Sequence, residues 1–213
     1  MVRVGLTGGL ACGKSTIGHM MAALGAHLLE ADTIAHALMK PGEKVHDEVV
    51  KRFGAEIVDR KDGSIDRARL ADAAFGPGRI AELNSIVHPA VIERQNAWLE
   101  EMAAKDPKGV AVVEAALILE AGARERFDKL VVVTCPHGEK IDRYVKRTIT
   151  RNSGPLAEIR AHKEAERRIA AQMPDAEKVK AADFVIDNGG TLQHTERQVA
   201  RLMEDLKQLA QVS

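Results

Sequence analysis

Short apolar runs alternate with longer amphipathic stretches along the chain. Val2 to Thr7 is an apolar, β-branched run that stops at Gly8-Gly9, which is typical of a buried strand. Apolar side chains then recur with the helical period from Gly13 to Leu24, and Ala26 to Leu29 forms a second short apolar run. A strand, a loop, a helix and a strand in this order predict the start of a parallel sheet.

The segment from residue 40 to residue 107 has a different pattern. Its periods predict helices over 45–53, 66–75 and 80 to about 104, with turns at 41–42, 62–63 and 76–78. We interpret this segment as a helical insertion between strands of the sheet.

Three further apolar runs predict the remaining strands at 109–113, 129–134 and 184–186. The stretch EAALILEAG bends away between the first two, and residues 139–180 are polar, charged and helical in pattern. An apolar stripe predicts a closing helix, and its members are Val199, Leu202, Met203, Leu206 and Leu209. These elements predict a three-layer α/β/α fold with a five-stranded parallel sheet.

Composition excludes several classes of function. Lys plus Arg and Asp plus Glu both number 31, and aromatic residues make up 3% of the chain, so no surface for nucleic acid is expected. No apolar run approaches the roughly 20 residues that span a bilayer, and no signal-peptide core precedes the first strand. Cys12 and Cys135 lie far apart in sequence and predict no disulfide framework. We therefore expect a cytoplasmic protein in a reducing compartment, without a membrane or nucleic-acid partner.

The stretch GLTGGLACGKST, Gly5 to Thr16, carries the first chemical motif, because it has the spacing G-x-x-x-x-G-K-[ST] of a P-loop. Glycines let backbone N–H groups surround a phosphate, and the following helix adds its positive N-terminus. Lys14 would reach the β- and γ-phosphates of a nucleotide, and the Ser15 hydroxyl would bind Mg²⁺. The expected nucleotide-binding residues here are Gly8, Ala11, Cys12, Gly13, Lys14, Ser15 and Thr16.

The rest of the chain favours a kinase over a GTPase, because no N-K-x-D segment for reading guanine is present. A helical insertion suits a small-molecule kinase, which must hold an acceptor and exclude water. Asp32 follows the second strand and could take a proton from the acceptor hydroxyl, or it could cap a helix that starts near Thr33. Glu30 could assist a metal or face solvent. The sequence leaves these alternatives open.

Two more candidates lie outside the first strands. His88-Pro89 suggests a helix start with His88 at the cap, and a functional role is the less common alternative. Arg143, Arg147 and Arg151 share a helix face, where they could clamp phosphates or form a solvated surface on which Glu139 pairs with Arg143. We favour the interpretation that this arginine-rich segment is a lid.

The chain is therefore expected to have three domains: a P-loop core (1–39, 108–138 and 180–213), a helical acceptor domain (40–107) and a lid (139–179).

The motifs and their order resemble one family. The stretches GLTGGLACGKST, EADTIAHALMKPG, FGAEIVDRKDGSIDRARL, LNSIVHP, LILEAG, RIAAQM and AADFVIDNGG follow one another as in the dephospho-CoA kinase family, and they span nearly the whole chain. A P-loop alone is shared by many unrelated proteins, whereas these motifs together are highly specific. The resemblance implies a P-loop kinase fold and transfer of the ATP γ-phosphate, with Mg²⁺, to the ribose 3′-hydroxyl of dephospho-CoA, the last step of coenzyme A synthesis.

The resemblance also implies roles for single residues. It makes Asp32 the general base and places His88 and Pro89 at the acceptor site. The other implied residues are Lys14, Ser15 and Thr16 in the nucleotide loop, Arg143 and Arg147 in the lid, and Asn188 and Gly189 in a turn near the adenine. The implied partners are the small molecules ATP and dephospho-CoA, and no obligate protein partner is predicted.

The chain departs from the family pattern at four places. The family has two aspartates around an alanine where this chain has Glu30 and Asp32, a proline at Ala116, and commonly a serine at Cys12. Residues 152–163 look like an insertion in the lid. A nucleoside monophosphate as acceptor, or a nucleotide-dependent regulatory or assembly protein without an acceptor, are the alternatives to this activity.

Overall fold

The computed structural model describes residues 1–74, 76, 78–149 and 155–212. It forms two compact units, which we call the core unit (Met1–Leu29 with Met102–Ser213) and the insertion unit (Glu30–Glu101). The predicted helix end at Phe75, the turn residue Pro77 and the lid residue Arg151 lie outside the described residues. No helix in the described ranges is both long and apolar enough to span a bilayer.

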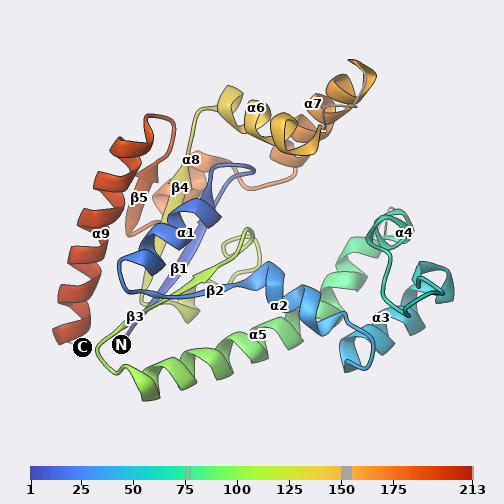
Figure 1. Cartoon of the computed structure of the whole chain (residues 1–213), viewed down its shortest axis with the longest axis horizontal. Helices are drawn as coiled ribbons and strands as arrows, with labels where there is room; N and C mark the ends of the chain where they lie inside the picture. The colour runs from blue at the N-terminus through green and yellow to red at the C-terminus, as the bar shows by residue number, and fades with distance from the viewer. Residues whose placement is uncertain (75, 77, 150–154, 213) are drawn as a thin grey trace. The chain divides into compact units, whose positions relative to one another are not determined.

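The core unit is built on a five-stranded sheet (Figure 1). Its strands are β1 (Val2–Gly8), β2 (His27–Glu30), β3 (Val110–Glu114), β4 (Lys129–Thr134) and β5 (Phe184–Asp187), in the order β2-β3-β1-β4-β5. The pairings of β1 with β3, of β1 with β4 and of β4 with β5 are parallel. The predicted α/β fold and its strands are therefore confirmed.

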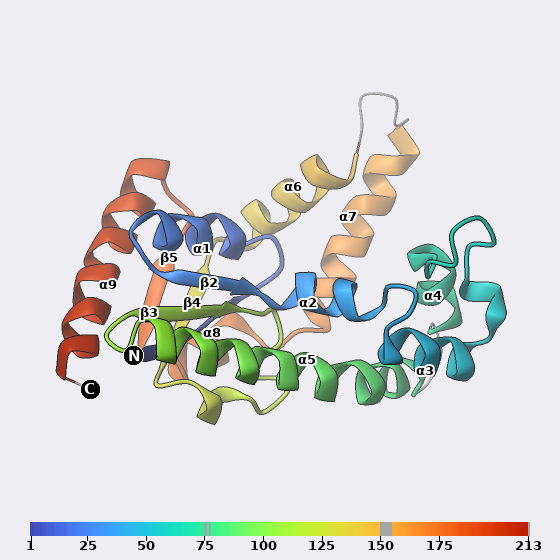
Figure 2. The same ribbon diagram turned by 60° about the horizontal axis from the view of Figure 1, so that its bottom comes forward.

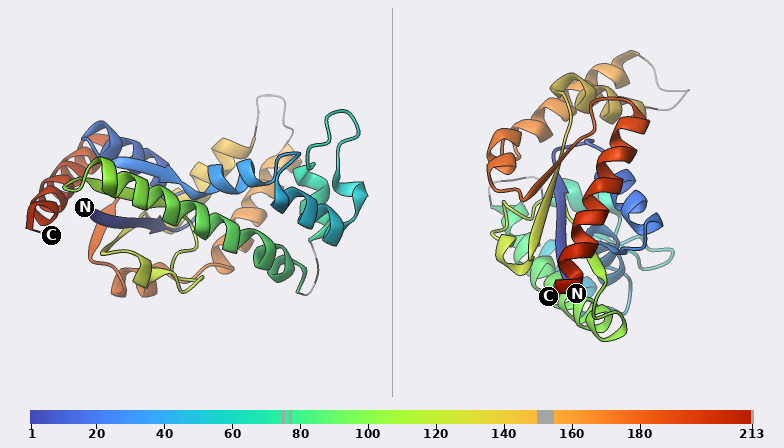
Figure 3. Two further views of the ribbon diagram at one scale, coloured as in Figure 1. Left: turned by 90° about the horizontal axis from the view of Figure 1, so that it is seen from below. Right: turned by 90° about the vertical axis from the view of Figure 1, so that its left-hand side faces the viewer.

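Both faces of the central strands are buried, which explains why their sequences are continuous apolar runs. On one face α1 (Lys14–Ala23) and α9 (Leu192–Val212) pack against β1, and Figure 1 shows α1 in front of the strands and α9 next to β5. On the other face, a Cβ atom at Gly5 would meet Phe127 and Ile118 from the β3–β4 connection. Helix α9 ends near the start of β1, as both views of Figure 3 show.

Three helices follow β4: α6 (His137–Thr148), α7 (Pro155–Ala170) and α8 (Asp175–Lys180). Helices α6 and α7 form a pair, visible in Figure 2, around a cluster of Ile141, Tyr144, Val145, Ala161 and Ala165. Leu10 and Ala11 of the P-loop pack against this cluster. The helix pair and the P-loop therefore share apolar contacts. Residues 155–163 of the expected insertion form the first part of α7, and residues 152–154 are not among those described.

The insertion unit consists of α2 (Ala31–Leu38), α3 (Lys44–Phe53), the short helix η1 (Ala55–Ile57), α4 (Arg67–Ala73) and most of α5 (Arg79–Lys105). Asp66 caps α4, because its carboxylate accepts hydrogen bonds from the backbone N–H groups of Ala68 and Arg69. A bridge between Val58 and Ile65 closes the turn before this cap. The block FGAEIVDRKDGSIDRARL therefore builds the fold of this unit.

The expected helix start at His88-Pro89 is wrong, because both residues lie inside α5. Proline in a helix removes one backbone hydrogen bond, here to the carbonyl of Ser85. Ser85 and Pro89 are both exposed, so water can reach that carbonyl. Buried Val87 and Val91 continue the apolar face on both sides of the proline, and this packing outweighs the local preference.

Candidate active site

The P-loop connects β1 to α1 and needs glycine at two of its positions. Gly13 has φ 90°, a left-handed conformation that glycine adopts without cost, and its carbonyl accepts the first helical bond from Ile17. A Cβ atom at Gly8 would collide with the carbonyl oxygen of Val133 on β4. Ala11, with φ 53°, is the one described non-glycine residue with a positive φ. The loop therefore has the tight curvature that phosphate binding requires.

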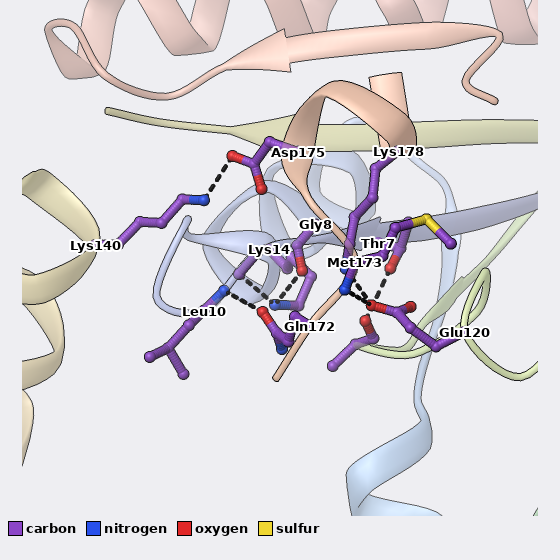
Figure 4. Close-up of polar contacts among 12 residues, drawn as sticks. Thr7, Gly8, Leu10, Lys14, Glu120, Lys140, Gln172, Met173, Asp175 and Lys178 are labelled. Carbon is purple, nitrogen blue, oxygen red and sulfur yellow. Dashed lines mark hydrogen bonds and ion pairs between the residues drawn. The ribbon is translucent and has the colours of Figure 1, made fainter. Parts of the chain in front are cut away.

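Lys14 and Ser15 begin α1 next to the loop. The Lys14 ammonium donates to the carbonyl oxygens of Gly8, at 3.3 Å, and of Gly9, at 3.1 Å, so it crosses the loop (Figure 4). The Ser15 hydroxyl donates to Oε1 of Glu114 at 2.7 Å. Thr16 lies in the first turn of α1 with an exposed side chain. The loop thus presents one cation and one hydroxyl–carboxylate pair.

Glu114 is a site residue that the sequence analysis missed. It ends β3, and only 8% of the residue is exposed. The sequence pattern places it in the stretch EAALILEAG, which is expected to bend away from the sheet. The available signal was its place directly after a buried strand, because ligands bind at the carboxyl ends of parallel strands.

The Ser15 hydroxyl and the Glu114 carboxylate are both oxygen donors, which are the ligands that Mg²⁺ takes. Mg²⁺ is usually held by one or two carboxylates together with substrate phosphates and water. No group of three His, Cys, Asp or Glu side chains gathers among the residues the structure describes. The Ser15 hydroxyl and the Glu114 carboxylate therefore fit a magnesium ion whose other ligands would be nucleotide phosphates and water.

Asn188 supports the loop from β5. Its Nδ2 donates to the carbonyl of Cys12 at 2.8 Å, and its Oδ1 accepts from the Thr195 hydroxyl at 2.9 Å. Its own carbonyl accepts from Arg143 of α6 at 2.8 Å. The backbone N–H of Gly189 donates to Oδ1 of Asp187 and fixes the turn. Asn188 thus joins the P-loop to β5 and to α6, and its expected contact with adenine stays a prediction.

The segment between α7 and α8 holds the loop from another direction (Figure 4). Oε1 of Gln172 accepts a hydrogen bond from the backbone N–H of Leu10 at 3.0 Å. Asp175 lies 2.6 Å from the ammonium of Lys140, whose side chain is 7% exposed. This ammonium and Asp175 are the nearest groups to a Cβ atom placed at Gly9. The RIAAQM motif therefore includes a direct contact to the P-loop, which the sequence analysis did not assign.

The two expected lid arginines have different surroundings. Arg143 pairs with Glu139 at 3.1 Å, as the alternative interpretation of this helix predicted, and also reaches Asn188. Arg147 is exposed and lies over the ring of Tyr144, 5.9 Å from its centre. The structure therefore brings Arg143, and not Arg147, next to a residue that touches the P-loop. A contact of either arginine with phosphate stays a prediction.

Asp32 is not the cap of α2. The helix begins at Ala31, Glu30 occupies the N-cap position, and no side chain caps it. The buried stripe of Ala31, Ile34 and Leu38 starts the helix earlier than expected. Asp32 is the second helical residue and is exposed, while Glu30 accepts from the Thr33 hydroxyl at 3.3 Å. The capping alternative is wrong, and the role of general base stays a prediction.

The insertion unit contains two hollows along α5. One has a volume of about 570 Å³ and is lined by Leu38, Val45, Pro89 and Arg94, among others. The second, of about 660 Å³, is lined by both His88 and Pro89. His88 is half-buried. Pro89 therefore lines both hollows and His88 lines the second, and each hollow is large enough for a small-molecule ligand, as the family resemblance implies for an acceptor site.

Comparison with known proteins decides the family. Residues 2–194 match a family model described as dephospho-CoA kinase. The chain belongs to the dephospho-CoA kinase family. It is 39% identical to the dephospho-CoA kinase of Aquifex aeolicus over 97% of this chain and 98% of the relative. It is 40% identical to that of Leifsonia xyli subsp. xyli over 97% of this chain and all (100%) of the relative. The protein is therefore a kinase.

Solved structures agree with the fold. A Thermus thermophilus crystal structure matches with a TM-score of 0.76 and 28% identity, over 96% of this chain and 97% of that one. The dephospho-CoA kinase from Campylobacter jejuni matches with a TM-score of 0.67 and 24% identity, over 97% of both chains. The expected P-loop kinase fold is thus confirmed for this family member.

A first prediction concerns Gln172. Gln172→Leu removes the acceptor of the Leu10 N–H and should raise KM for ATP by up to about tenfold, because a lost hydrogen bond is worth about 0.5–1.5 kcal/mol. Steady-state kinetics with varied ATP measure this change. Gln208→Leu, at an exposed position of α9, is the matched control and should leave KM unchanged. An unchanged KM in Gln172→Leu would contradict a role in holding the loop.

A second prediction concerns stability. The ammonium of Lys178, which is fully buried (0% exposed), lies 2.7 Å from Oε1 of Glu120, and the same oxygen accepts from the Met173 N–H (Figure 4). Lys178→Met keeps the volume but leaves the carboxylate without its counter-charge, and should lower the free energy of unfolding by about 1–3 kcal/mol. Denaturant unfolding measures this loss. Lys180→Met, on the exposed side of the same helix, should lower the free energy of unfolding by much less. Equal losses in the two variants would show that the buried Lys178–Glu120 pair stabilises the fold no more than the exposed pair does.

Proposed function

We propose that this protein carries out the reaction of its family: it transfers the γ-phosphate of ATP to the ribose 3′-hydroxyl of dephospho-CoA. The products are coenzyme A and ADP, so the reaction is the last step of coenzyme A biosynthesis. The observation that carries this proposal is a P-loop with Lys14 across it and Ser15 beside Glu114, in a chain of this family.

On the donor side, the loop N–H groups and Lys14 bind the β- and γ-phosphates. Lys14 also offsets the negative charge that grows on the transferring group. Ser15 and Glu114 would hold Mg²⁺, which supplies further positive charge to the phosphates when bound. Thr16 binds a further phosphate, and Asn188 and Gly189 lie at the adenine. The cytoplasmic location expected from the sequence belongs to this proposal as well.

On the acceptor side, we assign dephospho-CoA to residues 40–107, with His88 and Pro89 at the binding surface. Asp32 takes the proton of the 3′-hydroxyl as that oxygen attacks phosphorus. Residues 139–179 serve as a lid that keeps water out during transfer, and Arg143 and Arg147 would bind phosphate when the lid is closed. A closed site is needed because water would otherwise compete with the acceptor.

The test is ADP formation from Mg·ATP in three parallel reactions: with dephospho-CoA, with a panel of nucleoside monophosphates, and with no acceptor. We expect rapid ADP formation only with dephospho-CoA, accompanied by an equal amount of coenzyme A. Excess EDTA should stop the reaction. Turnover with a nucleoside monophosphate but not with dephospho-CoA would assign a different acceptor. Equal ADP formation in all three reactions would show that the protein hydrolyses ATP and transfers no phosphate to an acceptor.

A further inference from the structure

The only two cysteines of the chain meet beside the P-loop. Cys12 lies in the loop itself, and Cys135 follows directly after β4. They are 123 residues apart in sequence, yet their sulfur atoms are 3.5 Å apart. Both side chains are buried and both are free thiols. The sequence analysis expected no disulfide from their separation along the chain, but that separation does not determine their distance in the fold.

The surroundings give the two sulfur atoms different chemistry. A hydrogen bond from the Cys135 thiol, together with the charges of Lys140 and Lys14, lowers the pKa of Cys12 to about 7, although burial and Asp175 act in the opposite direction. The same hydrogen bond and burial raise the pKa of Cys135, against the charges of Arg143 and Lys140. Near neutral pH a substantial fraction of the molecules therefore carries a nucleophilic thiolate at Cys12 beside the Cys135 thiol.

We propose that Cys12 and Cys135 form a modification site for hydrogen peroxide, at which a disulfide closes and stops nucleotide turnover. The loss of turnover rests on the proposed kinase activity, whereas formation of the disulfide does not. Both sulfur atoms are buried, so the oxidant must be close to the size of water, and a bulky disulfide reagent is a poor match.

The chemistry takes place in two steps. The Cys12 thiolate attacks one oxygen of the peroxide, the O–O bond breaks, and the departing hydroxide takes up a proton, which leaves a sulfenic acid on Cys12 and one water. The Cys135 sulfur then attacks the Cys12 sulfur, its proton is lost, and the hydroxyl group leaves as a second water. Two thiols are thus oxidised by two electrons while one hydrogen peroxide is reduced to two waters.

The disulfide should distort the loop. The sulfur atoms must approach from 3.5 Å to about 2.05 Å, so at least one side chain or backbone must shift. The Cys12 backbone is already held, because its N–H donates to the Gly9 carbonyl and its own carbonyl accepts from Asn188. Gly13 and Lys14 follow directly. Since a misplacement of about 1 Å can cost about 10²-fold in rate, we expect at least a tenfold loss of activity.

The experiment treats the full chain with hydrogen peroxide and follows intact mass, peptide masses without reductant, and ADP formation with dephospho-CoA. We expect the loss of two hydrogen atoms, one peptide pair joined through Cys12 and Cys135, and at least tenfold lower activity that dithiothreitol restores. Cys135→Ser is the control: it should keep its activity before oxidation and gain oxygen atoms on Cys12 instead of losing hydrogen.

Several results would overturn the proposal. If the wild-type mass rises by oxygen atoms with no joined peptides, the pair does not form a disulfide. If joined peptides appear and activity stays within twofold, the disulfide does not stop turnover. The peptide masses require no turnover, so they decide the first point even if the acceptor is a different molecule. Should Cys135→Ser fail to fold, the wild-type peptide masses still decide it.

Discussion

Replacing Lys14 with alanine is expected to lower kcat/KM for ATP by about 10³-fold or more, because charge stabilisation of this kind in phosphoryl transfer has that magnitude. The ammonium bridges the Gly8 and Gly9 carbonyls across the loop in which the phosphates would lie. Alanine removes the positive charge at the place where negative charge would build up on the transferring phosphate. We expect kcat to fall and KM for ATP to rise, because the lysine would contact the nucleotide both in the ground state and in the transition state.

Steady-state kinetics and thermal melting on the purified variant measure this effect. Lys180→Ala is the matched control, because that lysine is exposed and pairs only with Glu177 of its own helix among the contacts seen. It should retain wild-type kinetics, and both variants should melt near the wild-type temperature. Activity of Lys14→Ala within a few-fold of wild type would contradict the assignment of the P-loop as the site that binds the ATP phosphates.

Replacing Asp32 with asparagine should lower kcat by about 10²–10⁴-fold, the usual contribution of a positioned general base. Asparagine keeps the size of the side chain and loses the carboxylate that would accept the hydroxyl proton. KM for ATP should stay close to wild type, because the P-loop lies in the other unit. Stability should change little, since Asp32 is exposed and caps no backbone N–H group.

A matched control separates catalysis from helix stabilisation. Asp47 is an exposed carboxylate in the first turn of α3, as Asp32 is in the first turn of α2. Both interact favourably with the helix N-terminus, so Asp47→Asn reproduces any loss of that interaction. We expect Asp47→Asn to keep wild-type kcat. Equal kcat values for the two variants would refute Asp32 as the base.

The sequence predicted the fold well because the apolar periods that define the elements are local. The buried strand expected at 109–113 is observed as Val110–Glu114, and the helix expected at 45–53 is Lys44–Phe53. The P-loop was predictable for the same reason: its glycines and Lys14 must follow one another in the chain to surround a phosphate.

The errors and omissions have two physical causes. At Asp32 and at His88-Pro89 the sequence analysis applied the local preferences of helix caps and of proline at a helix start. These preferences were outweighed by apolar stripes that extend to the N-terminal side of the expected starts. Contacts between distant segments had no local pattern at all. The bonds from Ser15 to Glu114 and from Leu10 to Gln172 join residues 99 and 162 positions apart, and only the folded chain brings them together.

The order of the strands has a consequence for synthesis on the ribosome. The central strand β1 is made first, yet Val2 pairs with Val110 and Val4 with Lys129. At about 5–20 residues per second, the apolar strand must wait roughly 5–20 s for its first neighbour. The insertion unit, from Glu30 to Glu101, is continuous in sequence and emerges in that interval, so all its internal contacts are available before the sheet can close. The newly made chain therefore carries an unpaired apolar strand throughout this interval, and such a strand is prone to aggregation until β3 and β4 have been made.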